Sequence, residues 1–276
     1  MNNKLKNFAR WLHLYVVSKI LKIFNLKLSL YRDDSDNMSA VFNKLRVVDR
    51  LRLNTSSDEF NFIRYIVNSP LIVKTRSQIF QDMFVLYILK NKRNGFFVEF
   101  GACDGIDLSN TYILEKEMGW QGILAEPAIS FHHNLSKNRS CGIDKRCVWS
   151  ESDKDVLFKE VEGTGLSTIS NFVDSGSLKY LRKKGVEYNV KTVSLVELLR
   201  DHGAPEEIDY LSIDTEGSEL EILENFDFNQ YKIKIITVEH NYSNTRNKMR
   251  DLLVGNGYKR VLRSLSQTDD WYVLND

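Results

Sequence analysis

The chain has 276 residues, of which 42% are hydrophobic and 27% charged. That length suits one large domain, or one domain with an extension, and the hydrophobic content is high enough for a folded core, which excludes a disordered protein. The formal net charge of +1 gives no overall positive field, so we expect no nucleic-acid partner. Three cysteines without a secretory signal are typical of reduced thiols in the cytoplasm.

The first 32 residues combine basic and aromatic side chains. They contain seven lysines and arginines and no acidic residue. Their longest unbroken apolar run, residues 14–17, is far shorter than the roughly 20 residues of a transmembrane helix. A basic helix with aromatic residues can lie on an anionic membrane face, so one hypothesis is peripheral contact with the inner side of a membrane. The alternatives are packing on the domain or on a second copy in a homo-oligomer.

Helical patterns fill the first 75 residues. Apolar periodicity covers residues 45–53 and 60–67, and Asn68-Ser69-Pro70 predicts a turn. From Ser77 the pattern changes to strands alternating with helices. We therefore predict a helical extension over residues 1–75 and a second domain over residues 76–276.

The predicted elements of the second domain alternate along the chain. Helices are predicted over residues 79–90, 108–118, 195–200, 220–224 and 248–254. Core strands are predicted over residues 96–100, 122–125, 145–149, 208–213 and 233–238, with additional strands over 156–160 and 188–193. Residues 258–262 and 271–274 should form a closing antiparallel pair. This order predicts an α/β fold, a mostly parallel sheet with helices on both faces, whose ligands bind beyond the carboxyl ends of the strands.

Glycines and acids follow the first core strand, in the sequence Glu99-Phe100-Gly101-Ala102-Cys103-Asp104-Gly105. Gly101 and Gly105 permit a tight turn and close approach of the backbone to a ligand. The strand-turn-helix context is that of a dinucleotide-binding loop, but the G-x-G-x-x-G spacing is missing. Carboxylates at Glu99 and Asp104 would repel a pyrophosphate and suit a cationic ligand with hydroxyls, such as a sulfonium with an amino acid tail. The alternative is a plain strand-turn-helix without a ligand.

An acidic residue, Glu126, ends the next strand, 25 residues after Gly101. An acid about 20 residues beyond a glycine loop accepts hydrogen bonds from ribose hydroxyls. The alternative interpretation is a surface carboxylate at a turn. The preceding glycine loop favours the ribose contact.

Further polar residues follow the later core strands. Asp214 and Glu216 come at the end of the fourth strand, and His240 stands between Glu239 and Asn241 at the end of the fifth. Such acids can position a substrate hydroxyl, act as a general base or hold a divalent cation. His240 has an intrinsic pKa suited to accepting a proton near neutrality. The alternatives are solvated turn carboxylates and a structural histidine.

Several stretches between Ser77 and Val273 form a specific combination, although none is specific alone. They are Ser77-Gln78 with Gln81-Asp82, residues 95–102 (GFFVEFGA), Leu108-Ser109-Asn110-Thr111, Leu114-Glu115-Lys116, residues 119–127 (GWQGILAEP), residues 213–219 (IDTEGSE) and Asp270-Trp271-Tyr272. In this combination the chain resembles the FkbM family of methyltransferases, a branch of the Rossmann-like enzymes that use S-adenosylmethionine.

The resemblance implies a seven-stranded class I fold with an antiparallel last strand, and S-adenosylmethionine as the cofactor. It implies that Glu99, Gly101 and Asp104 line the methionine and ribose side, that Glu126 holds the ribose diol, and that residues 148–150 flank the adenine. The remaining candidate cofactor-binding residues are Ala102, Gly105, Asn110, Pro127, Val148, Trp149, Ser150 and Asp214. Cys103 stands where many methyltransferases carry a second glycine. The acceptor implied is a hydroxyl oxygen, and we expect a sugar in a glycan or polysaccharide.

For catalysis we expect His240 or Asp214 to take the proton of the acceptor hydroxyl, with Glu216 beside them. A Mg²⁺ ion held by Asp214, Glu216 and Glu239 is an alternative that we do not favour, because acid spacing does not distinguish a metal site from a hydrogen-bonded pair. A second functional hypothesis is a non-catalytic methyltransferase-fold module that recruits partners through its basic N-terminal helices. A third, a dehydrogenase, conflicts with the acids at Glu99 and Asp104.

Overall fold

The computed structural model describes residues 56–161, 163–173, 179–182 and 185–275. Backbone packing divides the chain into two units, Met1–Lys74 and Thr75–Asp276, and each is described by itself. The basic segment 1–32 and the helix predicted over residues 45–53 lie outside the described residues. Within the described ranges, every helix is too short or too polar to cross a membrane.

In the first unit, the helix predicted over residues 60–67 lies within α3 (Ser57–Asn68). A capping box fixes its start. The Ser56 hydroxyl accepts the Glu59 N–H, and the Glu59 carboxylate accepts the Ser56 N–H. The turn predicted at Pro70 begins the short helix η1 (Pro70–Val73).

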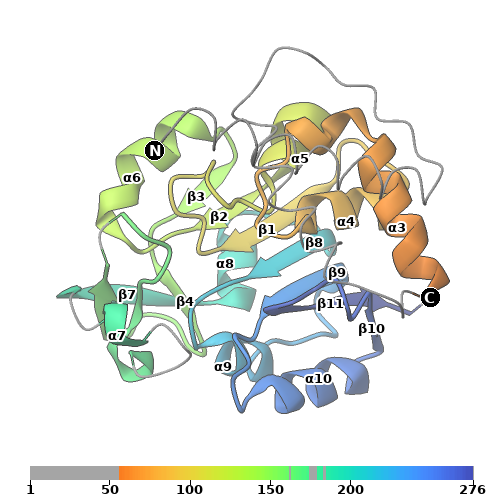
Figure 1. Ribbon diagram of the computed structural model, residues 1–276. Coiled ribbons are helices and arrows are strands. Elements are labelled where there is room, and N and C mark those ends of the chain that lie inside the picture. The colour runs from red at the N-terminus through yellow and green to blue at the C-terminus, as the bar shows by residue number, and fades with distance from the viewer. Residues whose placement is uncertain (1–55, 162, 174–178, 183–184, 276) are drawn as a thin grey trace, which may run out of the picture. The chain divides into compact units, whose positions relative to one another are not determined.

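The second unit is built on a seven-stranded sheet with the strand order β10-β11-β9-β8-β1-β2-β3 (Figure 1). Its strands are β1 (Phe96–Phe100), β2 (Gln121–Ala125), β3 (Gly142–Asp144), β8 (Glu207–Ile213), β9 (Lys232–Glu239), β10 (Tyr258–Val261) and β11 (Asp269–Leu274). All neighbours pair in parallel except β11, which is antiparallel to both β9 and β10. The predicted α/β class, with its antiparallel closing pair, is confirmed.

The third core strand is not where the sequence pattern placed it. We predicted it over residues 145–149, whereas β3 is Gly142–Asp144 and residues 147–149 form β4 (Cys147–Trp149) of a second sheet. The reason is burial. β3 lies at the edge of the sheet with Gly142 and Ile143 only half-buried, while Cys147 and Val148 are buried and therefore produced the stronger apolar signal.

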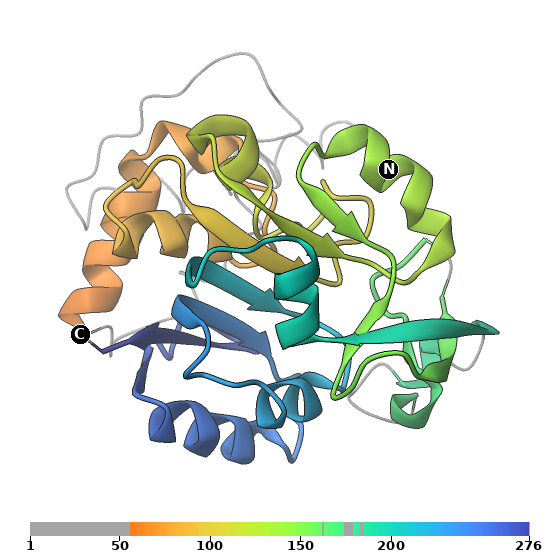
Figure 2. The same cartoon turned by 180° about the vertical axis from the view of Figure 1, so that it is seen from behind.

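Helices cover both faces of the main sheet (Figures 1 and 2). One face carries α8 (Leu195–Asp201), α9 (Glu219–Glu224) and α10 (Arg246–Gly255), whose residues Leu198, Leu223 and Leu253 pack with Val98, Leu211 and Ile236 of the strands. The other face carries α4 (Gln81–Ile88) and α5 (Tyr112–Met118). There Phe84 stacks on Trp271 of β11, with ring centroids 4.7 Å apart. Burial of each such side chain contributes about 1.5–3 kcal/mol to stability.

Helix α5 begins four residues later than predicted. Leu108 adopts a left-handed backbone conformation with φ of 61°, which no helix continues through. The next three residues, 109–111, instead bind the carboxylate of Glu99. The segment between the glycine loop and α5 is therefore an ordered turn rather than the first turn of a helix.

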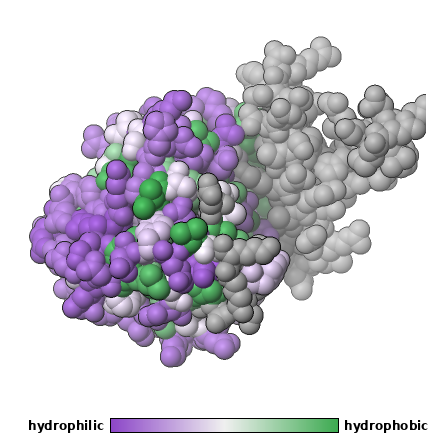
Figure 3. All heavy atoms as spheres, turned by 90° about the vertical axis from the view of Figure 1, so that its left-hand side faces the viewer, coloured by the Kyte–Doolittle hydropathy of each residue, from purple (hydrophilic) through white to green (hydrophobic). Residues whose placement is uncertain are grey.

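A second sheet is inserted between β3 and α8, with the strand order β4-β7-β5-β6. It comprises β4, β5 (Asp155–Glu160), β6 (Thr168–Ile169) and β7 (Val186–Ser194). The short helices η2 (Ser170–Phe172) and α7 (Lys179–Arg182) lie between β6 and β7 along the chain. The strands predicted over residues 156–160 and 188–193 are confirmed as β5 and β7. Helices α6 (Ile129–Asn138) and α7 and strand β7 lie on the left-hand side of Figure 1. Figure 3 views the molecule from that side, where hydrophobic patches alternate with hydrophilic ones.

Candidate functional site

The polar residues selected from the sequence gather at the carboxyl edge of the main sheet, where β1, β2, β8 and β9 end. Two of the connecting loops touch. A Cβ atom placed on Gly101, whose φ is 71°, would lie 2.1 Å from the carbonyl oxygen of Asp214. Only glycine allows this approach. The loop after β1 therefore lies directly against the loop after β8, as a shared binding site requires.

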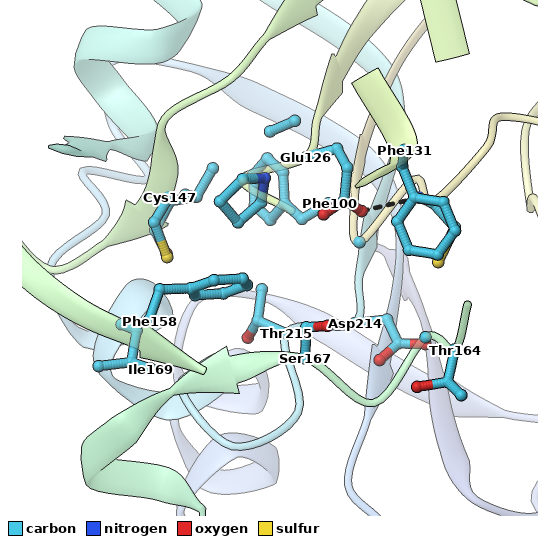
Figure 4. Close-up of a pocket in the computed structure, with 16 residues that line it drawn as sticks. Phe100, Glu126, Phe131, Cys147, Phe158, Thr164, Ser167, Ile169, Asp214 and Thr215 are labelled. Carbon is cyan, nitrogen blue, oxygen red and sulfur yellow. Dashed lines mark hydrogen bonds between the residues drawn. The ribbon is translucent and has the colours of Figure 1, made fainter. Parts of the chain in front are cut away.

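A first cavity lies between these loops and the second sheet (Figure 4). We call it the donor cavity; it is lined by Phe100, Gly101, Cys103, Ala125, Glu126, Pro127, Phe131, Cys147, Val148, Phe158, Thr164, Gly165, Ser167, Ile169, Asp214 and Thr215. In Figure 4 the carboxylates of Glu126 and Asp214 lie above and below the cavity, with Phe158 and Phe131 at its sides. Its free volume is about 40 Å³, well below the roughly 300 Å³ of small-molecule pockets, so a nucleoside enters only if a wall moves.

Glu126 is held firmly at the wall of the donor cavity. One carboxylate oxygen accepts the N–H of Cys103 and the other accepts the N–H of Ala128, both at 2.8 Å. Each oxygen keeps a lone pair that can accept another donor. Burial raises the pKa of Glu126 to about 7, although the two backbone hydrogen bonds oppose this. The geometry suits a ligand that presents hydroxyl donors.

Glu99 faces away from the donor cavity. Its carboxylate accepts hydrogen bonds from the Asn110 N–H at 2.6 Å, the Ser109 hydroxyl at 3.0 Å and the Thr111 hydroxyl. The buried guanidinium of Arg139 lies 3.8 Å away and also donates to the carbonyl of Gly105. Glu99 therefore organises the loop over residues 101–111 from behind. No pattern in the sequence predicted this role for Arg139, which lies at the end of α6.

Other candidate residues shape the loop without lining the cavity. Asp104 accepts the N–H groups of Ile106 and Asp107 at 2.8 and 2.9 Å, which is an Asx turn. Asn110 donates to the Ser212 hydroxyl at 2.9 Å, and its own carbonyl oxygen is buried without a hydrogen-bond partner among the described residues. Ala102, Gly105, Trp149 and Ser150 are likewise outside the lining, whereas Gly101, Glu126, Pro127, Val148 and Asp214 are part of it.

A second cavity, of about 610 Å³, is lined in part by the next residues of the loop after β8, and we call it the acceptor cavity. It is lined by Phe172, Arg182, Glu216, Gly217, Glu219, Glu221, Glu239, His240, Asn241, Tyr242, Ser243, Asn244 and Thr245. The two linings share no residue, but Thr215 of the first and Glu216 of the second are consecutive. One carboxylate oxygen of Asp214, in the first lining, lies within 4.8 Å of an oxygen of Glu216 and of Glu239 in the second. Residues predicted to be catalytic therefore lie close together on the loops between the two cavities.

The carboxyl groups at this junction disfavour one another's ionisation. Burial, followed by repulsion from Glu216 and Asp269, raises the pKa of Asp214 well above its ordinary value. Burial and repulsion from Asp214 have the same effect on the pKa of Glu239. Burial raises the pKa of Glu216 to about 7 despite the opposing charge of Arg182. The carboxyl group of Glu216 therefore exchanges its proton near neutral pH, and those of Asp214 and Glu239 hold a proton more tightly than ordinary carboxyl groups do.

His240 is engaged in the fold on both ring nitrogens. Its Nδ1 accepts the N–H of Tyr242 at 2.9 Å, which leaves the proton on Nε2, and Nε2 lies 3.1 Å from the carbonyl oxygen of Asp269. The side chain is 2% exposed. To accept a proton from a ligand, His240 would first have to give up one of these bonds. The geometry favours a structural role for this residue and leaves Asp214 and Glu239 as the better-placed bases.

Arg182 was not anticipated from the sequence. It is 1% exposed, forms a short ion pair with Glu216, and donates from Nε to the carbonyl of Leu166 at 3.1 Å. The Thr168 hydroxyl of β6 also donates to the carbonyl of Glu216, at 3.1 Å. The inserted sheet thus holds the loop after β8. The only sequence signal was the extra strand pattern between the third and fourth core strands.

Three carboxylates can converge on one point. One oxygen from each of Asp214, Glu216 and Glu239 lies within 4.8 Å of the other two. Oxygen ligands suit Mg²⁺, and the residues are those named for this alternative from the sequence. The guanidinium of Arg182 already balances the charge of Glu216, so part of the charge at this site is compensated without a metal ion.

Comparison with models of protein families matches residues 99–265 to the methyltransferase FkbM domain. No curated protein sequence matches the chain. Among solved structures, the chain is similar to methyltransferase FkbM from Methylobacillus flagellatus KT, with 12% identity and a TM-score of 0.46 over 86% of this chain and 58% of that chain. It thus spans less than two thirds of that protein's length.

Two further solved structures are similar. One is precorrin-6y C5,15-methyltransferase from Geobacter metallireducens GS-15, with 13% identity and a TM-score of 0.37 over 70% of this chain and 85% of that chain. The other is human methyltransferase 10 domain containing protein, with 11% identity and a TM-score of 0.36 over 86% of this chain and 96% of that chain.

Proposed function

Because the chain belongs to the FkbM family of methyltransferases, we propose that it transfers a methyl group from S-adenosylmethionine to a hydroxyl oxygen of a sugar in a glycan or polysaccharide. The observation that carries this proposal is the pair of cavities beside the loop after β8, with an oxygen of Asp214 from the first lining within 4.8 Å of oxygens of Glu216 and Glu239 from the second. One has the acceptors and aromatic walls that suit a nucleoside. The other is large enough for a small-molecule substrate.

The donor cavity fits S-adenosylmethionine in its chemistry. Glu126 would accept from the ribose diol, Phe131 and Phe158 would flank the base, and the oxygen of Asp214 without a partner among the described residues would accept from the amino group. When bound, the cofactor supplies a methyl group already activated on a sulfonium. The protein then has to align this group with the acceptor and exclude water.

The acceptor hydroxyl must lose a proton, and Asp214 with Glu239 receives it. Their carboxylate oxygens lie within 4.8 Å of each other, and their raised pKa values make the ionised member of the pair a stronger base than an ordinary carboxylate. Glu216, paired with Arg182, positions this pair by holding the loop after β8. His240 supports the loop after β9, where its Nδ1 accepts the N–H of Tyr242.

A divalent cation at Asp214, Glu216 and Glu239 is the alternative route, supported by the convergence of their oxygens. It would lower the pKa of the acceptor hydroxyl in place of a general base. Exhaustive treatment with EDTA distinguishes the two routes. Full turnover after chelation excludes the metal, and turnover restored by added Mg²⁺ excludes simple acid–base catalysis.

A non-catalytic binding module, recruiting partners through the N-terminal helices, remains the second candidate function. A binding module and a methyltransferase would both bind the cofactor, but only the methyltransferase would transfer its methyl group. Cytoplasmic location, peripheral membrane contact through residues 1–32 and homo-oligomer formation are part of the proposal and rest on the sequence alone.

The deciding experiment is titration calorimetry of the full chain with S-adenosylhomocysteine. We expect saturable one-to-one binding in the micromolar range that S-adenosylmethionine shares. No heat at millimolar ligand would refute the methyltransferase proposal. Release of S-adenosylhomocysteine in the presence of a glycan fraction then separates an enzyme from a binding module.

A further inference from the structure

Helix α6 begins beside the donor cavity and takes its cap from a distant strand. The first N–H groups of a helix have no partner inside the helix, and the residue before it usually supplies a side-chain acceptor. Ala128 holds that position here and has no such side chain. Instead, Glu126 accepts the N–H of Ala128 at 2.8 Å, and Glu160 of β5 accepts the N–H groups of Ile129 and Ser130, each at 3.1 Å.

Glu160 is itself held in one orientation. It is 7% exposed, and the Tyr188 hydroxyl of β7 donates a short hydrogen bond to its carboxylate. The Tyr188 oxygen also accepts the N–H of Ile129 at 3.1 Å, and its ring centroid lies 5.9 Å from that of Phe158. Burial raises the pKa of Glu160, but the hydrogen bonds from Ser130, Tyr188 and the Ile129 N–H outweigh burial and lower the pKa below its ordinary value. Glu160 is therefore ionised at neutral pH.

The contacts of Glu160 join two walls of the donor cavity. Phe158 lies two residues earlier on β5, with its side chain on the same face of the strand, and Phe131 lies in the first turn of α6. The two rings stand at the sides of the cavity (Figure 4). Ala128 and Phe131 also pack with Phe158 in one hydrophobic cluster. Glu160 thus ties the strand that carries Phe158 to the helix that directly follows Glu126 and its loop.

We propose that Glu160 is a positioning residue for the cofactor: by binding the first turn of α6, it holds the carboxylate of Glu126 where the ribose of the ligand reaches it. The proposal rests on the proposed methyl transfer, because the cofactor of that reaction is the ligand assigned to the donor cavity. Glu160 is not part of the cavity lining, so it acts on the ligand through Glu126.

The two carboxylates at this end of α6 also repel each other. Burial raises the pKa of Glu126 to about 7, its two backbone hydrogen bonds oppose the rise, and the charge of Glu160 adds to it. Without that charge, Glu126 should ionise at lower pH. The other titratable groups around Glu126 come from five elements: Cys103 of the loop after β1, His132 of α6, Cys147 of β4, Tyr188 of β7 and Asp214 of the loop after β8. Burial raises the pKa of both thiols and of the tyrosine, so these three stay neutral between pH 6 and pH 8.

The test is calorimetry of the full chain with S-adenosylhomocysteine at pH values from 6 to 8. We expect Glu160→Gln to weaken binding at pH 8 about threefold to thirtyfold, the range of one lost helix cap. We also expect the midpoint of the pH dependence to move to lower pH, because the repulsion of Glu126 is gone. A purely structural role would not move this midpoint. Asp155→Asn, an exposed acid at the start of the same strand, is the matched control and should change neither quantity.

Two further variants separate charge from position. Tyr188→Phe keeps the charge of Glu160 and removes the hydroxyl that orients it, so binding should weaken about twofold to tenfold, the effect of one hydrogen bond, with the midpoint unchanged. His132→Gln removes the imidazole whose Nε2 lies 2.8 Å from the carbonyl oxygen of Glu126, and it should keep the wild-type midpoint.

A double variant tests whether the effect passes through Glu126. Residues that act through one contact are not additive, so Glu160→Gln should weaken binding less in a Glu126→Gln background than in the wild type. Equal losses in the two backgrounds would overturn the proposal. Circular dichroism checks that each variant is folded. If Glu160→Gln does not fold, Tyr188→Phe decides, and wild-type affinity in that variant overturns the proposal.

The remaining outcomes separate this proposal from the proposed function. Failure of S-adenosylhomocysteine to bind the wild-type chain refutes methyl transfer itself. If the ligand binds the wild type and Glu160→Gln equally well, the positioning role is wrong and methyl transfer stands. The same holds if the midpoint moves in His132→Gln and not in Glu160→Gln, because the imidazole would then be the group that titrates with the ligand.

Discussion

At the scale of single residues, the donor cavity depends most on Glu126. Its two carboxylate oxygens bind backbone groups of two loops, Cys103 and Ala128, and still face the cavity. One side chain therefore closes the loop after β1 and, in the proposed function, also accepts from the ligand. A substitution that keeps the shape and removes the charge separates these two tasks.

We expect Glu126→Gln to weaken binding of S-adenosylhomocysteine by about 10-fold to 100-fold, the loss of one charge-assisted hydrogen bond. The pKa of Glu126 is raised to about 7, so wild-type affinity should increase between pH 6 and pH 8 as the carboxylate ionises. The variant should show a flat profile. Calorimetry at several pH values measures both.

The matched control is Glu207→Gln, at the exposed start of β8 and thus at the opposite end of the sheet. It should keep wild-type affinity and pH dependence. A pH profile that survives in Glu126→Gln would show that another group titrates with the ligand.

The position of Glu239, part of the proposed base pair, opposes the stability of the fold. Its carboxyl group is forced close to Asp214, and burial and repulsion raise its pKa. We expect Glu239→Gln to raise the free energy of unfolding at pH 8 by about 0.5–2 kcal/mol, as found when strained functional groups are removed. Turnover should fall at least tenfold. Thermal unfolding and release of S-adenosylhomocysteine measure the two effects. A variant that is both less stable and fully active would show that Glu239 is purely structural.

At the scale of elements, the turn over residues 101–111 is fixed by the buried pair of Glu99 and Arg139. Arg139 is 4% exposed and contacts Glu115 at 2.6 Å and Thr111 at 2.9 Å, as well as the carbonyl of Gly105. A glycine-containing turn would otherwise sample many conformations. The cofactor loop is therefore ordered by a residue from α6, which lies on the far side of β2 in the sequence.

We expect Arg139→Met to lower the free energy of unfolding by about 3–5 kcal/mol, because it leaves Glu99 buried without its counter-charge. Adding Glu99→Gln should recover part of that loss, since no unpaired charge then remains. Urea unfolding measures both. Arg93→Met, an exposed arginine, is the control and should cost less than about 0.5 kcal/mol. If Arg93→Met and Arg139→Met have equal effects, the buried pair does not organise the loop.

At the scale of the whole molecule, the carboxyl edge of the sheet concentrates acids whose ionisation opposes folding. The pKa values of Glu126 and Glu216 are raised to about 7 and that of Asp269 to about 6, in each case chiefly by burial. A carboxyl group whose pKa is higher in the folded state holds its proton more tightly there. The stabilisation that this tighter proton binding gives is complete below the pKa of the unfolded state. It is lost as the pH rises through the pKa of the folded state.

The midpoint of thermal unfolding of the ligand-free protein should therefore fall between pH 6 and pH 8. A loss of ~1 kcal/mol lowers the midpoint by about 2–4 °C in a domain of this size. Differential scanning calorimetry at constant ionic strength measures it. The fall should be smaller in Glu126→Gln, which lacks one of the groups. A midpoint that rises over this range would contradict the raised pKa values.

The sequence by itself determined the order of the elements and the placement of the polar residues. Apolar runs identified β1, β2, β8 and β9, and the acids after them had to meet at one edge because parallel strands share their carboxyl ends. These features are local, since hydrophobic periodicity and turn residues act over a few positions. The sequence pattern did not identify the edge strand β3 or the two-residue strand β6, because they are too short or too exposed to show such periodicity.

Only the tertiary structure decided what each polar side chain contacts. The carboxylate of Glu99 lies toward Arg139, and both ring nitrogens of His240 form hydrogen bonds inside the fold. Glu216 receives its counter-charge from Arg182, 34 residues earlier, at the end of α7 in the inserted segment. Each outcome depends on the packing of segments distant in sequence, and the direction of a side chain at a turn is set by that packing. The sequence of the loop after β1 thus predicted a ligand site, while the fold decided which residues of that loop line the cavity.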